Sequence, residues 1–265
     1  DFILYRTQEN EYLLVVNASN TDKDWEWLVK HNTEGAELEN ATDDYSIFAI
    51  QGPKTTEAIQ PLTEVNLSDL KFYSFEYADF ASASDVLISA TGYTGSGGFE
   101  VYVKNTDAEK VWNTIMEAGK SFDIAPIGLA ARDTLRLEMG YCLYGNDIDE
   151  TTSPLEAGLG WITKFNKDFI NAENLKSAKE AGLTNKLIGF ELTERGIPRQ
   201  DYDIVDAEGE KIGRVTSGTM SPSLGKAIGM GYVPLAYSKP DTEIFIQIRK
   251  KQIPAKVVKT PFYKG

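Results

Sequence analysis

The sequence predicts an α+β protein in which a mixed αβ part is followed by a small all-β domain. Helical and strand periodicities alternate as far as about residue 182, whereas beyond about residue 185 short strands recur with almost no helix between them. The chain has 265 residues, of which 42% are hydrophobic and 25% are charged. It is therefore long enough for two domains, or for one domain with an appended barrel.

The N-terminal part of the chain predicts two paired strands and a helix. Residues 1–6 and 11–17 are rich in β-branched and aromatic side chains, and they flank a polar turn at Gln8–Glu11. Residues 21–31 have helical spacing, with Thr21 suited to the first turn. The apolar face of this helix is formed by Trp25, Leu28 and Val29.

The middle of the chain alternates strands with helices. Tyr45–Gln51 is a predicted strand that Gly52-Pro53 ends, and a short helix is expected after the proline. Thr106 and Glu109 have the spacing of a capping box, which opens a helix. A further helix is expected over about 128–139. Three more strands are expected near 71–77, 86–91 and 99–103.

The C-terminal third has a different character. One more short helix is predicted from Asn171 to Gly182, where glycine ends it. We place the boundary between the αβ part and the all-β part within residues 169–184. Short strands with turn signals then indicate a small barrel or sandwich, near 186–193, 203–206, 211–216, 226–233, 243–249 and 255–259.

The charge balance disfavours some classes of partner. The chain has 40 Asp and Glu against 27 Lys and Arg, which gives a net charge of −13. Such a surface repels phosphate backbones, so we expect no nucleic-acid partner unless the basic residues cluster. No apolar run approaches the roughly 18–20 residues of a membrane helix, so we expect no membrane partner.

The single His31 and the single Cys142 limit the possible chemistry. One residue of each type cannot form a Cys/His zinc cluster or an intrachain disulfide, and we expect no metal. His31 is interpreted as a solvated residue at a helix end, and Cys142 as a buried structural thiol. An unpaired cysteine fits a reducing compartment. Chemistry is expected to rest on carboxylates, Tyr, Arg or Lys.

A glycine-rich stretch from Gly92 to Glu100 lies between two predicted strands. It lacks the Lys-Ser/Thr of a phosphate loop and the glycine spacing of a dinucleotide fold, and by itself it indicates a tight turn between antiparallel strands. Tyr93 and Glu100 flank this turn. A ring and a carboxylate could together frame a flat heterocycle with amidine-like N–H donors, such as a pterin, because an ionised Glu accepts two parallel hydrogen bonds.

Arg132 and Arg136 are four residues apart and share one face of the predicted helix. In one interpretation they pair with acidic neighbours on a solvated surface. In the other, the surrounding Leu and Ala positions bury the helix on much of its circumference, and each Arg needs a partner from the protein or from a ligand. The acidic loop that follows lacks the regular spacing of a calcium loop, and we interpret it as structural; its residues include Asp147, Asp149 and Glu150.

Three runs of the chain have the character of motifs: Thr91-Gly-Tyr-Thr-Gly-Ser-Gly-Gly-Phe-Glu100, Gly128-Leu-Ala-Ala-Arg-Asp-Thr-Leu-Arg-Leu-Glu138, and Leu143-Tyr-Gly-Asn-Asp-Ile-Asp-Glu150 with Pro154–Trp161 after it. Together they resemble the glycine cleavage T-protein family, whose members are tetrahydrofolate-dependent aminomethyltransferases. Thr216–Gly225 and Lys259–Tyr263 resemble the signature and the closing strand of that family's barrel domain. The resemblance extends over essentially the whole chain.

This resemblance implies a ferredoxin-like αβ region that binds folate, followed by a small C-terminal all-β domain of the barrel or jelly-roll-like kind. Family members carry a further region before the position where this chain starts, so we expect an N-terminally truncated chain. The implied domains are a remnant of a first αβ domain at 1–44, a second αβ folate-binding domain at 45–168, a linker helix at 169–184 and the β-barrel domain at 185–265.

The resemblance also implies the roles of individual residues. In the family a Gly-Gly-x-x-Asp-Asp pair leads into a strand, and a Val-Val-Asn strand follows. Asp1–Tyr5 and Val15–Asn17 fit this pattern, which makes Asp1 the catalytic residue that the family uses at the reacting folate nitrogen. The implied folate-binding residues are Tyr5, Asn17, Tyr93, Glu100 and Arg132.

The implied reaction starts from an aminomethyl group held on the lipoyl arm of a carrier, the H-protein. Ammonia leaves, and the one-carbon unit becomes a methylene bridge between two nitrogens of tetrahydrofolate. A carboxylate near N5 stabilises the cationic carbon and manages the proton. The expected partners are therefore the lipoylated H-protein and tetrahydrofolate as co-substrate. The expected location is the bacterial cytoplasm, or the mitochondrial matrix if the source is a eukaryote.

Three alternatives remain open at this stage. Sulfonium-compound demethylases and the C-terminal parts of methylated-glycine oxidases share this fold and acceptor, although the Leu143–Glu150 run favours T-protein. Folate-binding proteins of iron–sulfur cluster assembly carry a Lys-Gly-Cys-Tyr-x-Gly motif, whereas here Cys142 stands in a different position without the Lys. The third alternative is a folded but inactive fragment.

Overall fold

The computed structural model describes residues 2–264, and its contacts divide the chain into two compact units. Unit 1 comprises residues 1–92 and 96–126, and unit 2 comprises residues 93–95 and 127–265. The predicted α+β class is confirmed, because unit 1 is built around an αβ sheet and unit 2 around an all-β barrel. The four narrower domain ranges stay predictions.

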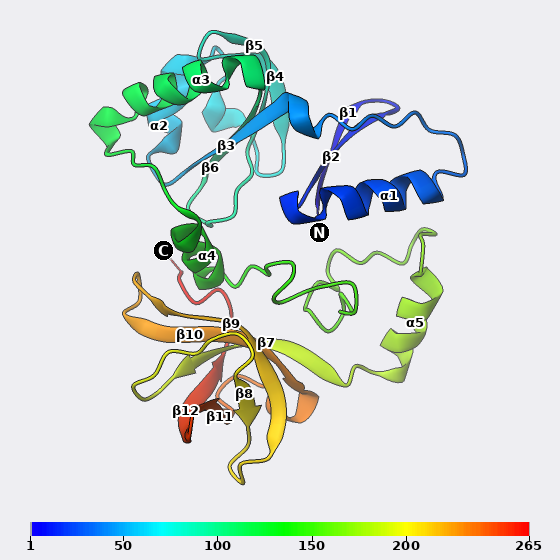
Figure 1. Ribbon diagram of the computed structural model, residues 1–265, viewed down its shortest axis with the longest axis vertical. Helices are drawn as coiled ribbons and strands as arrows, with labels where there is room; N and C mark the ends of the chain where they lie inside the picture. The colour runs from blue at the N-terminus through cyan, green and yellow to red at the C-terminus, as the bar shows by residue number, and fades with distance from the viewer. Residues whose placement is uncertain (1, 265) are drawn as a thin grey trace. The chain divides into compact units, whose positions relative to one another are not determined.

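Unit 1 contains a four-stranded antiparallel sheet with the strand order β3-β6-β5-β4 (Figure 1). Its strands are β3 (Tyr45–Gln51), β4 (Phe75–Phe80), β5 (Ala83–Ser89) and β6 (Gly98–Lys104). Helix α3 (Asn105–Ala118) buries Val111 and Ile115 in the same core as Val101 of β6, and α2 (Thr55–Ile59) contributes Ile59. Because side chains alternate along a strand, Glu100 of β6 belongs to the opposite face.

A two-stranded ribbon packs on that opposite face. Its strands are β1 (Phe2–Gln8) and β2 (Glu11–Val16), and Tyr5 of β1 forms a small core with Leu87 and Tyr102 of the sheet. Helix α1 (Thr21–His31) follows the ribbon. The predicted hairpin and helix are confirmed, although none of the helix residues is buried, so its apolar face is only partly covered.

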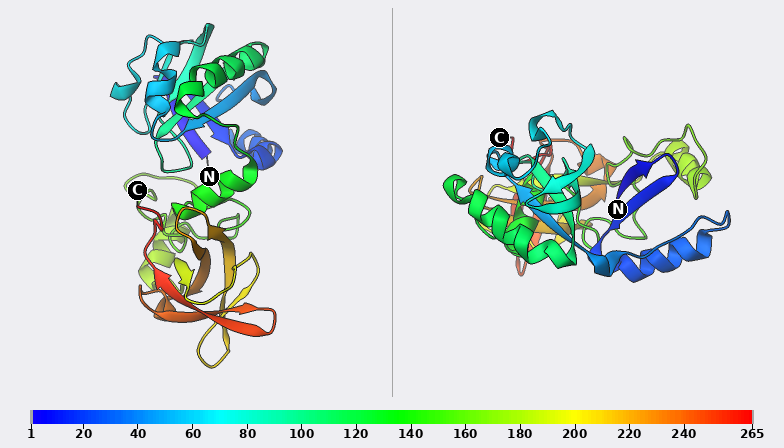
Figure 2. Two further views of the ribbon diagram at one scale, coloured as in Figure 1. Left: turned by 90° about the vertical axis from the view of Figure 1, so that its left-hand side faces the viewer. Right: turned by 90° about the horizontal axis from the view of Figure 1, so that it is seen from above.

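Unit 2 contains a closed β-barrel (Figure 2). Its strand order is β10-β7-β12-β11-β8-β9. Between the two predicted options, barrel and sandwich, the structure shows the barrel, because β10 pairs with both β7 and β9 and so closes the ring. Phe190, Ile204 and Ile244 are fully buried in its core. The strands are β7 (Asn185–Leu192), β8 (Asp203–Val205), β9 (Lys211–Ser221), β10 (Lys226–Pro234), β11 (Glu243–Ile248) and β12 (Lys251–Val258).

Two helices accompany the barrel in unit 2. Helix α4 (Leu129–Glu138) lies against β9 and β10, and its Leu137 packs with Met230 and Phe262. Helix α5 (Ala172–Ala181) is the predicted short helix, and Gly182 ends it with a φ of +88°, as glycine at that position predicts. Among residues 2–264, none of the helices combines the length and the apolar character needed to cross a bilayer.

Several predicted boundaries were wrong, and turn geometry explains the error at β4. The strand expected near 71–77 is β4, which starts at Phe75, because Ser74 closes a turn onto the carbonyl of Lys71. The β4–β5 hairpin then turns at Ala81 and Ser82, which both have positive φ. Such turns are usually made by Asn-Gly or Gly-rich pairs, so the sequence carried no signal for this one.

Other local predictions also require correction. Helix α3 begins at Asn105 directly after β6, so Thr106 and Glu109 lie inside the helix and do not form the expected capping box. The last strand, expected near 255–259, is β12 and begins at Lys251. It starts early because β11 and β12 are joined by a tight hairpin in which Ile248 pairs with Lys251.

Candidate functional site

A chain of hydroxyl groups leads to the carboxylate of Glu100 in unit 1. Ser89 pairs with Glu100 in the sheet register, and Thr91 follows two residues later on the same side. The oxygen–oxygen distances are 3.1 Å from Tyr102 to Tyr5, 3.0 Å from Tyr5 to Ser89 and 3.0 Å from Ser89 to Thr91. The Thr91 hydroxyl then donates to Oε2 of Glu100 at 2.5 Å. The carboxylate is thus held by a side chain of its own hairpin.

The hydroxyl groups in this hydrogen-bonded series are shielded from water. The exposed fractions are 4% for Tyr5, 0% for Ser89 and 3% for Thr91, whereas Glu100 is half-buried. Burial raises the pKa of Tyr102 far above its ordinary value, and the hydrogen bond to Tyr5 raises it further. Tyr102 therefore keeps its proton. A half-buried carboxylate backed by buried hydroxyls can accept hydrogen bonds from a ligand.

The glycine-rich turn beside Glu100 is fixed at both ends. The side-chain amide of Gln51 donates to the carbonyls of Thr91 and Phe99, each at 3.2 Å. Gly98 has a φ of +127°, and a Cβ at this position would lie 2.3 Å from the carbonyl oxygen of Ile50. Only glycine fits there. The prediction of a tight turn between antiparallel strands is confirmed.

Tyr93 and Arg132 are in contact in unit 2. The guanidinium carbon of Arg132 lies 4.5 Å from the centroid of the Tyr93 ring, which is a cation–π arrangement. The Tyr141 ring stacks with Tyr93 at a centroid distance of 5.8 Å, and the Tyr93 hydroxyl donates to the backbone carbonyl of Cys142. Burial raises the pKa of Tyr93 to about 12, although Arg136 and Arg132 act to lower it. The ring therefore stays neutral.

A buried ion pair anchors the helix that carries Arg132. The Arg136 side chain is 1% exposed, and it contacts the buried carboxylate of Asp147 at 2.6 Å. It also donates to the hydroxyl of Ser217 at 2.8 Å, and the hydroxyls of Thr216 and Ser217 donate to Asp147. Helix α4 is thereby tied to strand β9, and the structural interpretation of the acidic loop holds at Asp147.

The expectation that α4 is buried on much of its circumference is wrong for its first turns. Leu129 is 83% exposed, and only Arg136, Leu137 and Glu138 are buried. The hydroxyls of Ser221 and Ser223 donate to Glu138, so this carboxylate is bound by serines rather than by an arginine. The Leu and Ala spacing indicates a helix, but it does not show which of its turns the barrel covers.

The structure joins four of the predicted binding residues in two pairs, Tyr5 with Glu100 through the hydroxyl chain and Tyr93 with Arg132. The Tyr5 hydroxyl is hydrogen-bonded to Ser89 and Tyr102 inside unit 1. Asn17 is half-buried and directly follows β2, where a short 3-10 helix begins. Asp1, the predicted catalytic residue, lies outside the described residues.

Sequence reasoning missed the residues that support these pairs. Ser89 and Thr91 are polar residues at alternate positions at the end of β5, and Glu100 and Tyr102 alternate in the same way along apolar β6. This period of two was a usable signal for one polar stripe on the sheet. The contribution of Tyr141 left no such signal, because its contact with Tyr93 joins segments that are distant along the chain.

We expect Cys142 to resist alkylation in the folded protein. Burial raises the pKa of its thiol to about 12, and the thiolate is the form that reacts. At pH 8, iodoacetamide should label the folded chain at least about 100-fold more slowly than the urea-unfolded chain. Cys142 is the single cysteine, so the labelled mass reports on this residue alone. Equal rates in the two states would contradict the prediction.

Among residues 2–264, no three His, Cys, Asp or Glu side chains gather in an arrangement suited to a metal ion. His31 is exposed at the end of α1 and stacks on Trp27 at 4.1 Å, which agrees with its interpretation as a solvated helix-end residue.

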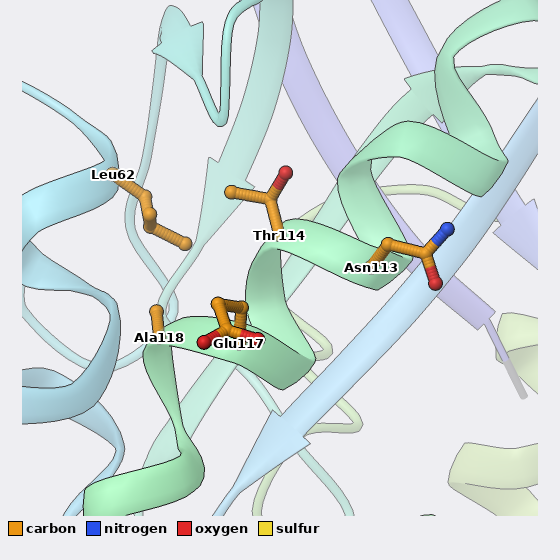
Figure 3. A pocket seen from close by; sticks show the side chains of 5 residues that line it. All are labelled: Leu62, Asn113, Thr114, Glu117 and Ala118. Carbon is orange, nitrogen blue, oxygen red and sulfur yellow. The ribbon is translucent and has the colours of Figure 1, made fainter.

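A shallow hollow of about 400 Å³ lies beside α3, and none of the predicted binding residues is among the five that line it (Figure 3). It is lined by Leu62, Asn113, Thr114, Glu117 and Ala118. The Thr114 hydroxyl already donates to the carbonyl of Lys110 at 2.8 Å, and Glu117 forms an ion pair with Lys120. The hollow therefore offers a ligand few uncommitted polar groups, and we assign no chemistry to it.

Comparison with known proteins places both parts of the chain. Residues 1–167 match the GCVT N-terminal domain family, and residues 185–264 match the glycine cleavage T-protein C-terminal barrel domain family. A protein of Flavobacterium psychrophilum named aminomethyltransferase is 62% identical over 264 residues, which cover 100% of this chain and 73% of that protein. The aminomethyltransferase of Bacteroides fragilis is 56% identical over 266 residues, which cover 100% of this chain and 74% of that protein.

A solved structure shares the fold. The crystal structure of glycine cleavage system aminomethyltransferase T from Bartonella henselae superposes with a TM-score of 0.88 at 33% sequence identity. The superposition covers 99% of this chain and 71% of that one. The two family matches, the identity to the relatives and the shared fold agree, and the chain belongs to the glycine cleavage T-protein family.

Proposed function

We infer that the chain is an aminomethyltransferase of the glycine cleavage system. It transfers the one-carbon unit of an aminomethyl group to tetrahydrofolate, releases ammonia and forms 5,10-methylenetetrahydrofolate. The observation that carries this inference is the 62% identity, along the whole chain, to a protein named for that activity. Family membership favours this reaction over the demethylase and iron–sulfur alternatives, because the two curated relatives described above are both named aminomethyltransferase.

We propose that Glu100 binds the pterin ring of the folate. Its carboxylate is half-buried and is held through Oε2 by Thr91. An ionised carboxylate is an acceptor with about four lone-pair sites, so it can still receive the paired N–H groups of a pterin edge. The network behind Glu100, which includes Tyr5, supports this role without offering a second charged group.

We also propose that Tyr93 and Arg132 of unit 2 bind folate. Their contact presents a flat aromatic ring beside a fixed positive charge. Folates combine a flat heterocycle with an anionic glutamate tail, and both features suit this pair. Asn17 is proposed to line the pterin pocket at the end of β2.

We further propose that the carboxylate of Asp1 stabilises the cationic carbon and manages the proton at the reacting nitrogen. The donor is an aminomethyl group on the lipoyl arm of the carrier H-protein, and holding both substrates in attack geometry supplies part of the rate. No metal is required for this chemistry. The relatives described above come from bacteria, which supports the bacterial cytoplasm as the location.

The reaction itself tests the proposal. The chain is incubated with tetrahydrofolate and a lipoylated carrier protein loaded with the aminomethyl group, and ammonia and methylenetetrahydrofolate are measured. We expect both products in equal amounts, and none when a sulfonium compound or N-methylglycine replaces the loaded carrier. The absence of ammonia release, under conditions in which the Flavobacterium relative is active, would overturn the proposed activity for this chain.

A further inference from the structure

We propose that Thr91 is a positioning residue for folate binding, which holds one oxygen of Glu100 so that the rest of the carboxylate faces the ligand. This inference rests on the function proposed above. It is carried by the buried hydroxyl chain, in which Tyr102, Tyr5 and Ser89 stand behind Thr91.

The hydrogen bonds place the hydroxyl of Thr91 between the buried hydroxyl groups and the carboxylate. An ionised carboxylate only accepts, so Thr91 is the donor to Glu100. The Thr91 hydroxyl also lies within hydrogen-bond distance of Ser89, at 3.0 Å, and Tyr5 donates to Ser89 at 3.0 Å. The hydroxyls of Tyr5 and Tyr102 are hydrogen-bonded at 3.1 Å. Thr91 therefore contacts buried hydroxyls on one side and binds the carboxylate on the other.

This arrangement fixes the carboxylate before a ligand arrives. Hydrogen bonds at low exposure are stronger than hydrogen bonds in water. Thr91 and Ser89 are at most 3% exposed, so water does not compete for their hydroxyl groups. Glu100 itself is only half-buried and, without Thr91, could rotate among several orientations. When the carboxylate is already fixed, less conformational entropy is lost on ligand binding.

A purely structural role for the buried hydroxyls is the competing explanation. If the hydroxyls are only structural, removing one lowers the thermal stability. If Thr91 positions the carboxylate, removing its hydroxyl weakens folate binding specifically. Thr55 is a matched control, because it is 5% exposed, lies in the same unit and belongs to α2, on the face of the sheet opposite to Glu100. Thr91→Val and Thr55→Val make the same chemical change in two buried positions, and Thr91→Ser restores the hydroxyl at the first.

The experiment measures the dissociation constant of 5-formyltetrahydrofolate by calorimetry, together with kcat, the KM for tetrahydrofolate and the melting temperature, in the full protein. We expect Thr91→Val to weaken binding about 10- to 100-fold, the range for a lost hydrogen bond to a charged group, and to raise KM more than it lowers kcat. Thr91→Ser should remain within about threefold of the parent, which is less than the cost of a lost neutral hydrogen bond. Thr55→Val should change the melting temperature without changing the affinity.

The outcomes separate this inference from the proposed function. If Thr91→Val binds as tightly as the parent while Glu100→Ala does not bind, the positioning role is wrong and the folate site stands. If Thr91→Ser binds folate as weakly as Thr91→Val does, the missing hydroxyl is not the cause of the weaker binding, and the inference also fails. If the parent does not bind folate, both proposals fall.

A second variant keeps the inference testable if Thr91→Val does not fold. Ser89→Ala leaves Thr91 in place and removes the buried hydroxyl that lies 3.0 Å from the Thr91 hydroxyl. We expect this change to weaken folate binding about threefold or more, as for a lost neutral hydrogen bond. An unchanged affinity in Ser89→Ala would overturn the inference.

Discussion

Replacing Asp147 with alanine will lower the free energy of unfolding by about 3–5 kcal/mol, the cost of breaking a buried ion pair by removing one partner. The Arg136 guanidinium is 1% exposed and loses its 2.6 Å contact with the buried carboxylate, while it keeps an ion pair with Asp133, whose side chain is 56% exposed. Two hydroxyls that donate to Asp147, those of Thr216 and Ser217, lose their acceptor at the same time. Urea unfolding followed by circular dichroism measures the change as a lower midpoint at constant slope.

The matched control is an exposed ion pair in the same unit. Asp203 and Lys211 are in contact at 2.5 Å, but their side chains are 41% and 60% exposed. Solvent screens such pairs, so Asp203→Ala should cost less than about 1 kcal/mol. If the two variants lose similar stability, burial is not the reason that the Asp147 pair matters, and our explanation of how α4 is anchored fails.

Glu100→Ala will weaken the binding of 5-formyltetrahydrofolate at least about 100-fold, which corresponds to about 2.7 kcal/mol. Each hydrogen bond to a charged group contributes about 1.5–3 kcal/mol, and the carboxylate is proposed to accept two from the pterin. Calorimetric titration of the parent and the variant measures the difference. The melting temperature should change little by comparison, because Glu100 is only half-buried.

Glu117→Ala is the control for this change. Glu117 lies in unit 1, its side chain is 72% exposed, and it lines the shallow hollow on α3. Folate affinity should be unchanged in this variant. An affinity lost in Glu117→Ala and retained in Glu100→Ala would move the folate site to the hollow and overturn our assignment.

Local signals in the sequence were sufficient for most of the secondary structure and for the family. The periodicities of 3.6 and 2 depend on neighbouring residues alone, which is why β3 and α1 begin and end where predicted. The boundaries failed where backbone geometry departed from residue preference. Ala81 and Ser82 take positive φ without the glycine or asparagine that usually announces such a turn.

The candidate site was predictable as a set of residues but not as an arrangement. Tyr93, Glu100 and Arg132 stood out because they lie in motifs, and their positions are fixed along the chain. The partners of these residues depend on strand register and on long-range packing, which no local pattern encodes. Thr91 meets Glu100 because β5 and β6 pair in one register. Arg136 meets Asp147 because the loop after α4 folds back on the helix. The sequence shows two arginines on one helix face, but only the tertiary structure places the buried carboxylate of Asp147 beside Arg136 and the ring of Tyr93 beside Arg132.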